Sequence, residues 1–173
     1  MHIGGYGPIH EERNILLESL CANNIEIDFW GYGIENLSSH SPIRKRYKGE
    51  AWGLDMYNLL INSKMTVTKH ISSVAGQFAN NMRLYEATGV GTLLITDCKD
   101  NLHEMFAPGK EVVTYRDADE AAEQISYYLA HEEERKQIAA AGQRRTLQEH
   151  TYLHRMAEMV EIVKKYLQIK EEI

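Results

Sequence analysis

Arg83 and Glu86 are the residues whose types and spacing best suit binding chemistry. They stand three apart in an expected helix and therefore share one helical face. One interpretation is a surface ion pair, which stabilises a helix by roughly a few tenths of a kcal/mol. The other is a ligand site, in which the Glu86 carboxylate accepts two ribose hydroxyls while Arg83 and the helix start face a diphosphate. The spacing alone leaves both interpretations open.

A glycine turn near the amino terminus is a second place that suits phosphate. Residues 4–7 read Gly-Gly-Tyr-Gly and lead into a helical run, and unpaired N–H groups at a helix start attract anions. The turn lacks the spaced glycines of a dinucleotide site, and Gly31-Tyr32-Gly33 stands where that site needs an acidic residue. We therefore exclude an NAD site, and an ordinary strand-to-helix turn is the simpler interpretation.

Polar residues that follow expected strands are further candidates. His70 follows the run 65–69, and ligand loops of open α/β sheets lie after strands. A contact with a ligand phosphate or sugar and a histidine satisfied within its loop both remain open. Asp97 closes a buried strand, as the phospho-acceptor of a receiver domain does. A receiver also needs acidic residues after its first strand, where this chain has glycines.

The histidines and cysteines predict no metal site. His150 and His154 stand four apart, but the glutamate of an HExxH site is missing between them, so we expect histidines on a helix surface. Cys21 and Cys98 show no CxxC or metal-ligand spacing. Free thiols of this kind fit a reducing, cytoplasmic location.

The overall charge and length exclude several classes of protein. The chain has 173 residues, enough for one domain with a real core, and a formal net charge of -6. Such a charge argues against a nucleic-acid partner. The basic run at residues 44–48 is most simply a solvated loop, although it also suits a phosphate or an acidic acceptor. No apolar run is long enough for an integral membrane segment.

The elements that must position these residues alternate between short β-rich runs and helical stretches. This order is expected when crossover helices join parallel strands, so we predict an α/β fold with helices on both faces of a parallel sheet. We expect a polar, irregular loop over residues 34–50 and a helix capped by Asp117 with Glu120. The expected strands are 1–8, 25–29, 65–69, 92–96 and 111–115, and the expected helices include 54–62, 80–88 and 101–106.

The last residues predict a terminal helix over 150–173. Five apolar side chains recur there at three and four residues and form one stripe. We expect this stripe to dock on the domain's own core or on a partner domain, so that removing residues 150–173 lowers stability or solubility. The stripe consists of Tyr152, Met156, Val160, Val163 and Leu167.

A family resemblance rests on residues 86–95, Glu-Ala-Thr-Gly-Val-Gly-Thr-Leu-Leu-Ile. This segment resembles the signature in the carboxyl-terminal domain of GT-B glycosyltransferases of the group 1 type. The run Asn81-Met82-Arg83-Leu84-Tyr85-Glu86 is similar to the branch that includes the spore-maturation CgeB proteins. The similarity spans nearly the whole chain. It includes the turn at Gly4 and Gly5 with His10 and Arg13, Tyr47-Lys48-Gly49, residues 102–115 with Phe106-Ala107-Pro108-Gly109, residues 139–145 and His150-Thr151-Tyr152.

The resemblance implies a Rossmann-like domain that holds a nucleoside diphosphate sugar as substrate, with no cofactor and no bound metal. It places the base near residues 47–49, the diphosphate near Asn81 and Met82, and the ribose on Glu86. Many group 1 enzymes have another glutamate eight positions earlier, where this chain has Phe78. The expected nucleotide-sugar-binding residues are Gly4, Gly5, Tyr47, Gly49, His70, Asn81, Met82, Arg83 and Glu86, and the catalytic residues stay unknown.

We therefore predict that residues 1–173 form the nucleotide-sugar-binding domain of a glycosyltransferase with an unknown acceptor. UDP, GDP or dTDP would be the carrier. Similar enzymes have a preceding amino-terminal acceptor domain, which we expect to be absent here, so the isolated chain should be inactive. Two alternatives share the fold: a non-catalytic nucleotide-binding or assembly domain, and half of a sugar-nucleotide epimerase.

Overall fold

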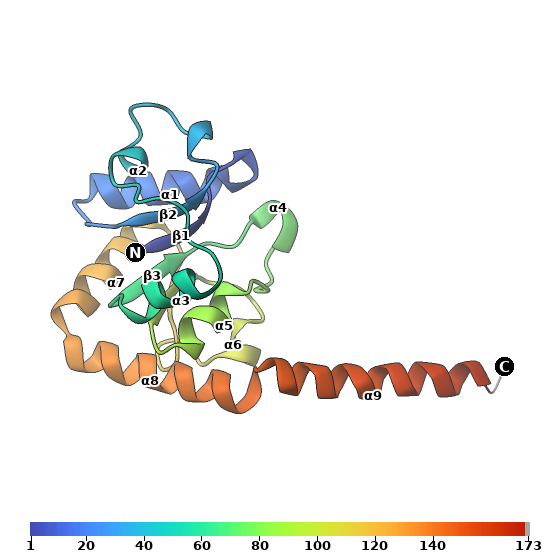
Figure 1. The fold of residues 1–173 in the computed structure, drawn as a ribbon. Coiled ribbons are helices and arrows are strands. Elements are labelled where there is room, and N and C mark those ends of the chain that lie inside the picture. Colours follow the sequence, from blue (N-terminus) through green and yellow to red (C-terminus); the bar gives the residue numbers. More distant parts are fainter. Residues whose placement is uncertain (172–173) are drawn as a thin grey trace.

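Five parallel strands and the helices between them form the fold (Figure 1). The computed structural model describes the backbone of residues 1–171 and the side chains of residues 1–167. The α/β class predicted from the sequence is confirmed. The strands are β1 (His2–Gly5), β2 (Phe29–Tyr32), β3 (Met65–Thr68), β4 (Leu93–Asp97) and β5 (Val113–Tyr115).

The strands form two parallel sheets, β1-β2 and β3-β4-β5, where one sheet was expected. The two sheets lie side by side because Val67 N donates to Met1 O at 3.2 Å. The His2 imidazole fills part of the seam, with Nδ1 2.8 Å from Val67 O. The spatial order is therefore β2-β1-β3-β4-β5, and the direction of winding reverses between β1 and β3. Ligands of open α/β sheets bind at the carboxyl ends of the strands on either side of such a reversal.

Helices cover both faces of the sheets, as the alternating pattern predicts (Figure 1). Two buried apolar clusters, one on each face, hold these layers together. The strands between them, β3 and β4, are buried along their whole length. Helices α1 (Glu11–Ala22) and α7 (Ala118–Ala130) pack on one face, α3 (Gly53–Ile61), α5 (Arg83–Gly89) and α6 (Leu102–Met105) pack on the other, and α8 (Glu132–Glu149) contacts α5, α7 and β4.

Several boundaries differ from the predicted ones. Residues 25–28 form no regular ladder, so β2 begins only at Phe29, although Asp28 O accepts from His2 N at 2.9 Å and Ile25 and Ile27 are buried in the expected alternation. The predicted helix at 80–88 begins three residues later and runs over Arg83–Gly89. The cap of α7 is confirmed, because Asp117 Oδ1 accepts from Glu120 N at 2.9 Å.

The loop predicted to be irregular over residues 34–50 contains two short helical turns. The Ser41 hydroxyl accepts from Ile43 N at 3.3 Å and starts the second of them, just before Pro42. Polar composition concealed these turns, because single turns are too short to show a helical period. The short elements of the fold are η1 (Pro8–His10), η2 (Ile34–Asn36), α2 (Pro42–Lys45) and α4 (Ser72–Ala75).

The terminal helix α9 (Tyr152–Glu171) points straight away from the domain (Figure 1). Its apolar stripe is exposed in this structure, with Tyr152 74% and Val160 49% accessible. Docking of the stripe on the domain's own core is therefore wrong, and only the alternative of an outside partner remains. No helix in the described part of the chain is both long and apolar enough to cross a membrane.

Candidate functional site

A cleft of about 300 Å³ lies at the carboxyl ends of β1 and β3, where the direction of winding reverses. Its walls come from the ends of these strands, the first turn of α5 and the segment between β1 and α1. Residues far apart in the sequence meet here because parallel strands end at one edge. Of the residues predicted from the sequence, the cleft brings together Gly4, Gly5, His70, Asn81, Met82, Arg83 and Glu86.

Tyr47 and Gly49 lie outside the walls of this cleft and hold the end of β2 instead. Tyr47 Oη donates to Gly31 O at 2.5 Å, and Gly31 N donates to Gly49 O at 2.9 Å. Gly31 needs this support and its glycine identity, because its φ is +129° and a Cβ would lie 1.8 Å from Gly4 O. The next residue, Tyr32, does line the cleft and stacks on Trp52 with ring centroids 5.4 Å apart.

The interior wall of the cleft contains two largely buried guanidinium groups. Arg13 is 9% exposed and donates to Gly5 O, while the Arg83 side chain is 14% exposed. Burial lowers the pKa of both arginines. Glu86 offers the nearest negative charge, with Oε2 3.1 Å from Arg83 Nη1, in a geometry that does not make a hydrogen bond. Two buried cations thus share the charge of one carboxylate.

Further buried polar atoms of this wall have no protein partner among the described residues. They are Arg13 Nε, His10 Nδ1 and, behind the glycines, His2 Nε2. Burial, together with the charge of Arg13, lowers the pKa of His10 to about 4 and that of His2 well below its usual range. Both rings are therefore neutral near pH 7. The neutral His2 ring donates from Nδ1 to Val67 O, so its Nε2 is an acceptor, whereas Arg13 Nε–H is a donor without a partner. An unpaired buried donor on a buried cation is the arrangement that an anionic ligand satisfies.

The glycines at the end of β1 make room for these side chains. A Cβ on Gly4 would lie 3.1 Å from Arg13 Nη2, and one on Gly5 would lie 2.6 Å from His10 Nε2. One N–H group of this turn has a backbone partner, since Tyr6 N donates to Tyr32 O at 2.9 Å. The sequence did not reveal that Gly4 and Gly5 leave room for the side chains of Arg13 and His10.

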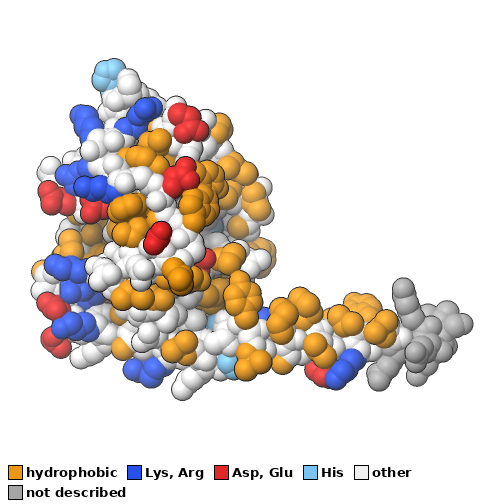
Figure 2. Space-filling view, viewed as in Figure 1, with side chains coloured by type: hydrophobic (Ala, Val, Ile, Leu, Met, Phe, Trp, Pro, Cys, Tyr) orange, Lys and Arg blue, Asp and Glu red, His pale blue; other side chains and the backbone are white. Residues whose placement is uncertain are grey.

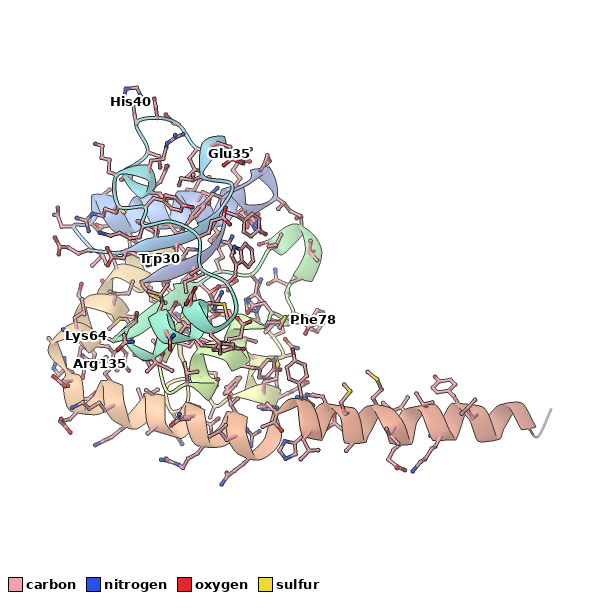
Figure 3. The ribbon with its side chains drawn as sticks, in the orientation of Figure 1. Trp30, Glu35, His40, Lys64, Phe78 and Arg135 are labelled. Atoms are coloured by element: carbon pink, nitrogen blue, oxygen red, sulfur yellow. The ribbon has the colours of Figure 1, made fainter. Side chains whose placement is uncertain are left out.

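The first turn of α5 forms the facing wall. The helix starts at Arg83, and Asn81 Oδ1 accepts from Leu84 N at 3.2 Å as a local cap. Glu86 consequently lies in the first turn of α5, where the predicted helix start had placed it in the second. Phe78, which stands where many group 1 enzymes have a glutamate, is 60% exposed and points away from the domain (Figure 3). It lies outside the wall of this cleft.

His70 and Asp97 form a buried pair at the ends of the neighbouring strands β3 and β4. Asp97 Oδ1 lies 2.7 Å from His70 Nδ1 and accepts from His70 N at 2.9 Å. Burial alone would raise the pKa of Asp97, but the His70 hydrogen bonds and the Lys99 charge lower it below its usual value. Asp97 is therefore an anchor for His70. Two polar residues directly after adjacent strands were the available signal for this pair.

The other candidates from the sequence have structural partners. His150 Nε2 lies 2.9 Å from Met105 O, and His154 Nδ1 lies 2.7 Å from Thr151 Oγ1. Within the described residues, no group of three or more His, Cys, Asp or Glu could hold a metal ion. In the basic run at 44–48, Arg46 and Lys48 pair with carboxylates of residues 26 and 28 at 3.7 and 3.5 Å. The run is exposed to solvent, as expected, but its first two residues, Arg44 and Lys45, belong to the short helix α2 and not to a loop.

Comparison with known proteins identifies the family. A family model described as "Glycosyl transferase-like" matches residues 13–161. This chain belongs to that glycosyl transferase-like family. No curated protein sequence matches the chain significantly.

Solved structures similar to this glycosyl transferase-like chain share its fold at low identity. A glycosyltransferase from Rickettsia africae matches with a TM-score of 0.75 and 12% identity, over 96% of this chain and 47% of its own. HepE from Anabaena, in complex with UDP-glucose, matches with a TM-score of 0.75 and 12% identity, over 95% and 48%. The carboxyl-terminal domain of LpcC, a group 1 glycosyl transferase from Francisella tularensis, matches with a TM-score of 0.61 and 10% identity, over 87% and 85%.

The glycosyl transferase-like chain spans about half the length of the first two of these structures. Its fold is that of a GT-B carboxyl-terminal domain, as the resemblance implied. Polar residues that line the cleft but were left outside the site predicted from the sequence include His10, Arg13 and Tyr32. Asp97 does not line the cleft and contacts His70 from behind.

Proposed function

We propose that this chain is the nucleotide-sugar-binding domain of a glycosyltransferase, which moves a sugar from a nucleoside diphosphate to an acceptor. The observation that carries the proposal is the pair of buried arginines, Arg13 and Arg83, for which Glu86 is the one ion-pair partner among the side chains of residues 1–167. Taking a charge out of water is costly unless a partner compensates it. A diphosphate between the two guanidinium groups supplies the missing negative charge. HepE, a protein of the same fold, is known with UDP and with UDP-glucose.

We infer one orientation of the donor in the cleft. The diphosphate lies between Arg13 and the first turn of α5, beside Asn81 and Met82, and the nucleoside ribose lies on Glu86. An ionised carboxylate accepts two hydroxyl hydrogens at once. The base then points toward the rim, where the loop with Tyr47 and Gly49 holds β2. We assign no cofactor and no metal to this site, since the guanidinium groups meet the charge of the leaving diphosphate.

Within the family we propose the branch similar to the CgeB proteins, on the run from Asn81 to Glu86. We also propose that catalysis needs an amino-terminal domain that binds the acceptor. Proteins of twice this length share the fold, which supports a second domain beyond residues 1–173. The isolated chain should bind the donor and transfer no sugar. Sugar transfer by the isolated chain at about 1 per second or faster, in a panel of donors and acceptors, would contradict the need for a separate acceptor-binding domain.

Calorimetry with UDP, GDP and dTDP and their glucose or mannose conjugates tests the proposal. We expect Glu86→Ala to weaken the best ligand by about one to two powers of ten, the loss of charge-assisted hydrogen bonds to the ribose. The matched control is Glu104→Ala, because Glu104 is exposed on α6 outside the cleft. If no ligand binds the parent chain, the fold serves assembly or regulation instead. If only Arg83→Ala abolishes binding, the phosphate assignment holds and the ribose assignment fails.

A further inference from the structure

His70 and Asp97 form a buried pair joined by two hydrogen bonds, and a histidine that merely lines a cleft would not need both. His70 is 2% exposed and Asp97 is 7% exposed, at the ends of β3 and β4. One carboxylate oxygen, Asp97 Oδ1, accepts from both the backbone N–H and the ring Nδ1–H of His70. Because the ionised carboxylate only accepts hydrogen bonds, Nδ1 carries the hydrogen. The pair therefore fixes both the orientation and the tautomer of the ring.

The opposite ring nitrogen, Nε2, is buried and has no hydrogen-bond partner within the described residues. The ring lines the main cleft and also a smaller adjoining cleft of about 190 Å³ beside η1. With Nδ1 protonated, a neutral ring offers only a lone pair at Nε2. Phosphate oxygens are also acceptors, so a contact between Nε2 and a phosphate needs a second proton on the ring.

Charged groups from every neighbouring element act on this ring. Asp97 places a negative charge against Nδ1, and Lys99 Nζ lies 3.4 Å from Asp97 Oδ2. An anion that enters the cleft adds negative charge beside the ring and favours the protonated ring in the complex. The other titratable groups facing this corner come from six segments. They are Lys69 after β3, His10 of η1, Glu11, Glu12 and Arg13 of α1, Tyr32 of β2, Arg83 and Glu86 of α5, and Tyr115 of β5, whose Oη donates to Thr68 O.

We propose that His70 binds the donor diphosphate through Nε2–H as an imidazolium, that Asp97 positions it, and that the chain takes up a proton when the donor binds. The inference rests on the proposed function of the same cleft. The proton comes from solvent and forms the Nε2–H bond, and no other bond changes. His70 then contacts the donor directly, whereas Asp97 acts only through the ring.

The test is calorimetry of UDP-glucose, with GDP- and dTDP-glucose alongside, in buffers of different ionisation enthalpy. The diphosphate diester of a nucleotide sugar does not titrate near pH 7, so any proton taken up belongs to the protein. We expect a net uptake of protons and an affinity that falls by up to tenfold per pH unit on the alkaline side. His70→Gln should bind roughly tenfold more weakly near pH 7 and take up no proton.

Three variants separate this role from a structural one. Asp97→Asn should reduce the uptake at the same pH, because the carboxylate no longer favours the charged ring. His10→Gln should still take up the proton, and His103→Gln, on the exposed side of α6, should behave like the parent chain. If His70→Gln unfolds, His70→Asn replaces it, since an Asn amide can still donate to Asp97 and lacks the Nε2 edge.

Distinct results overturn the two proposals. Binding of a nucleotide sugar without proton uptake, or uptake that survives in His70→Gln and His70→Asn, overturns the role of His70 and leaves the donor site intact. A loss of affinity in His70→Gln for the sugar conjugate but not for UDP assigns Nε2 to a sugar hydroxyl and also overturns it. If no nucleotide sugar binds the parent chain, the proposed function fails and the role of His70 fails with it.

Discussion

Two regions contain side chains without suitable partners in the domain: the cleft at the ends of β1 and β3, and the helix α9. The side chains of the cleft are polar and buried, whereas those of α9 are apolar and exposed. In the cleft, guanidinium and imidazole groups are buried without enough partners. On α9, a row of apolar side chains faces outward, visible as orange along the helix in Figure 2. Single exposed apolar residues are ordinary, but a continuous row marks a contact surface.

The difference lies in what each region costs the unliganded domain. A buried cation without a partner lowers the stability of the fold, because its lost hydration is not replaced. An apolar side chain on a projecting helix leaves that stability almost unchanged, since it is exposed in the folded and unfolded chain alike. The cleft should therefore respond to ligands and pH, whereas α9 should respond to neither.

The largest expected effect is the loss of donor binding in Arg13→Met. Methionine keeps much of the side-chain volume and removes the charge, so affinity for the best nucleotide diphosphate should fall about a hundredfold, roughly 2.7 kcal/mol. The melting temperature without ligand should stay equal or rise, because a buried unpaired cation has gone. Arg116→Met is the matched control, since the Arg116 side chain is 80% exposed. A strong loss of stability with unchanged affinity would show that Arg13 is purely structural.

Lowering the pH should reduce the stability of the fold through His2, which is buried behind the glycines of the cleft. The His2 pKa is lowered in the fold by burial and by Arg13, so the folded ring stays neutral while the unfolded ring is protonated below about pH 6.5. Stability is then full above that pH and is lost as the pH falls. Between pH 7 and pH 5 the loss from this group should approach about 2 kcal/mol.

Urea unfolding at the two pH values measures this effect. The variant His2→Asn keeps a donor near Val67 O and removes the titration, so its stability should depend less on pH. His10 acts in the same direction, while Asp97, with a lowered pKa, loses its contribution only at more acid pH. An equal pH dependence in the parent chain and in His2→Asn would contradict the prediction.

The smallest effects are expected at the carboxyl end, where the junction and α9 should differ. His150 packs between Tyr85 and Phe106 with ring centroids 5.2 and 5.3 Å apart, so His150→Ala should cost about 1 kcal/mol. Deletion of residues 157–173 should change the free energy of unfolding by less than about 0.5 kcal/mol and raise solubility. A large drop in melting temperature after that deletion would show that α9 packs on the domain in solution.

The sequence by itself determined the order of strands and helices and much of the binding chemistry. Ile25 and Ile27 alternate with exposed residues, and residues 93–95 are apolar on both faces, so burial followed from a period of two and from a continuous run. The Asp117 cap was readable because its partner stands three residues away. These signals lie within a few residues of one another, where local geometry decides the structure.

Only the tertiary structure decided which side chains meet. Asp97 reaches His70 across 27 positions, and Arg13 enters the same cleft as Arg83, because the strand order places the ends of β1, β3 and β4 side by side. The periodicity on α9 correctly predicted an amphipathic helix and could not say what covers it. A period records that a face is apolar, whereas the partner of that face depends on how distant segments pack.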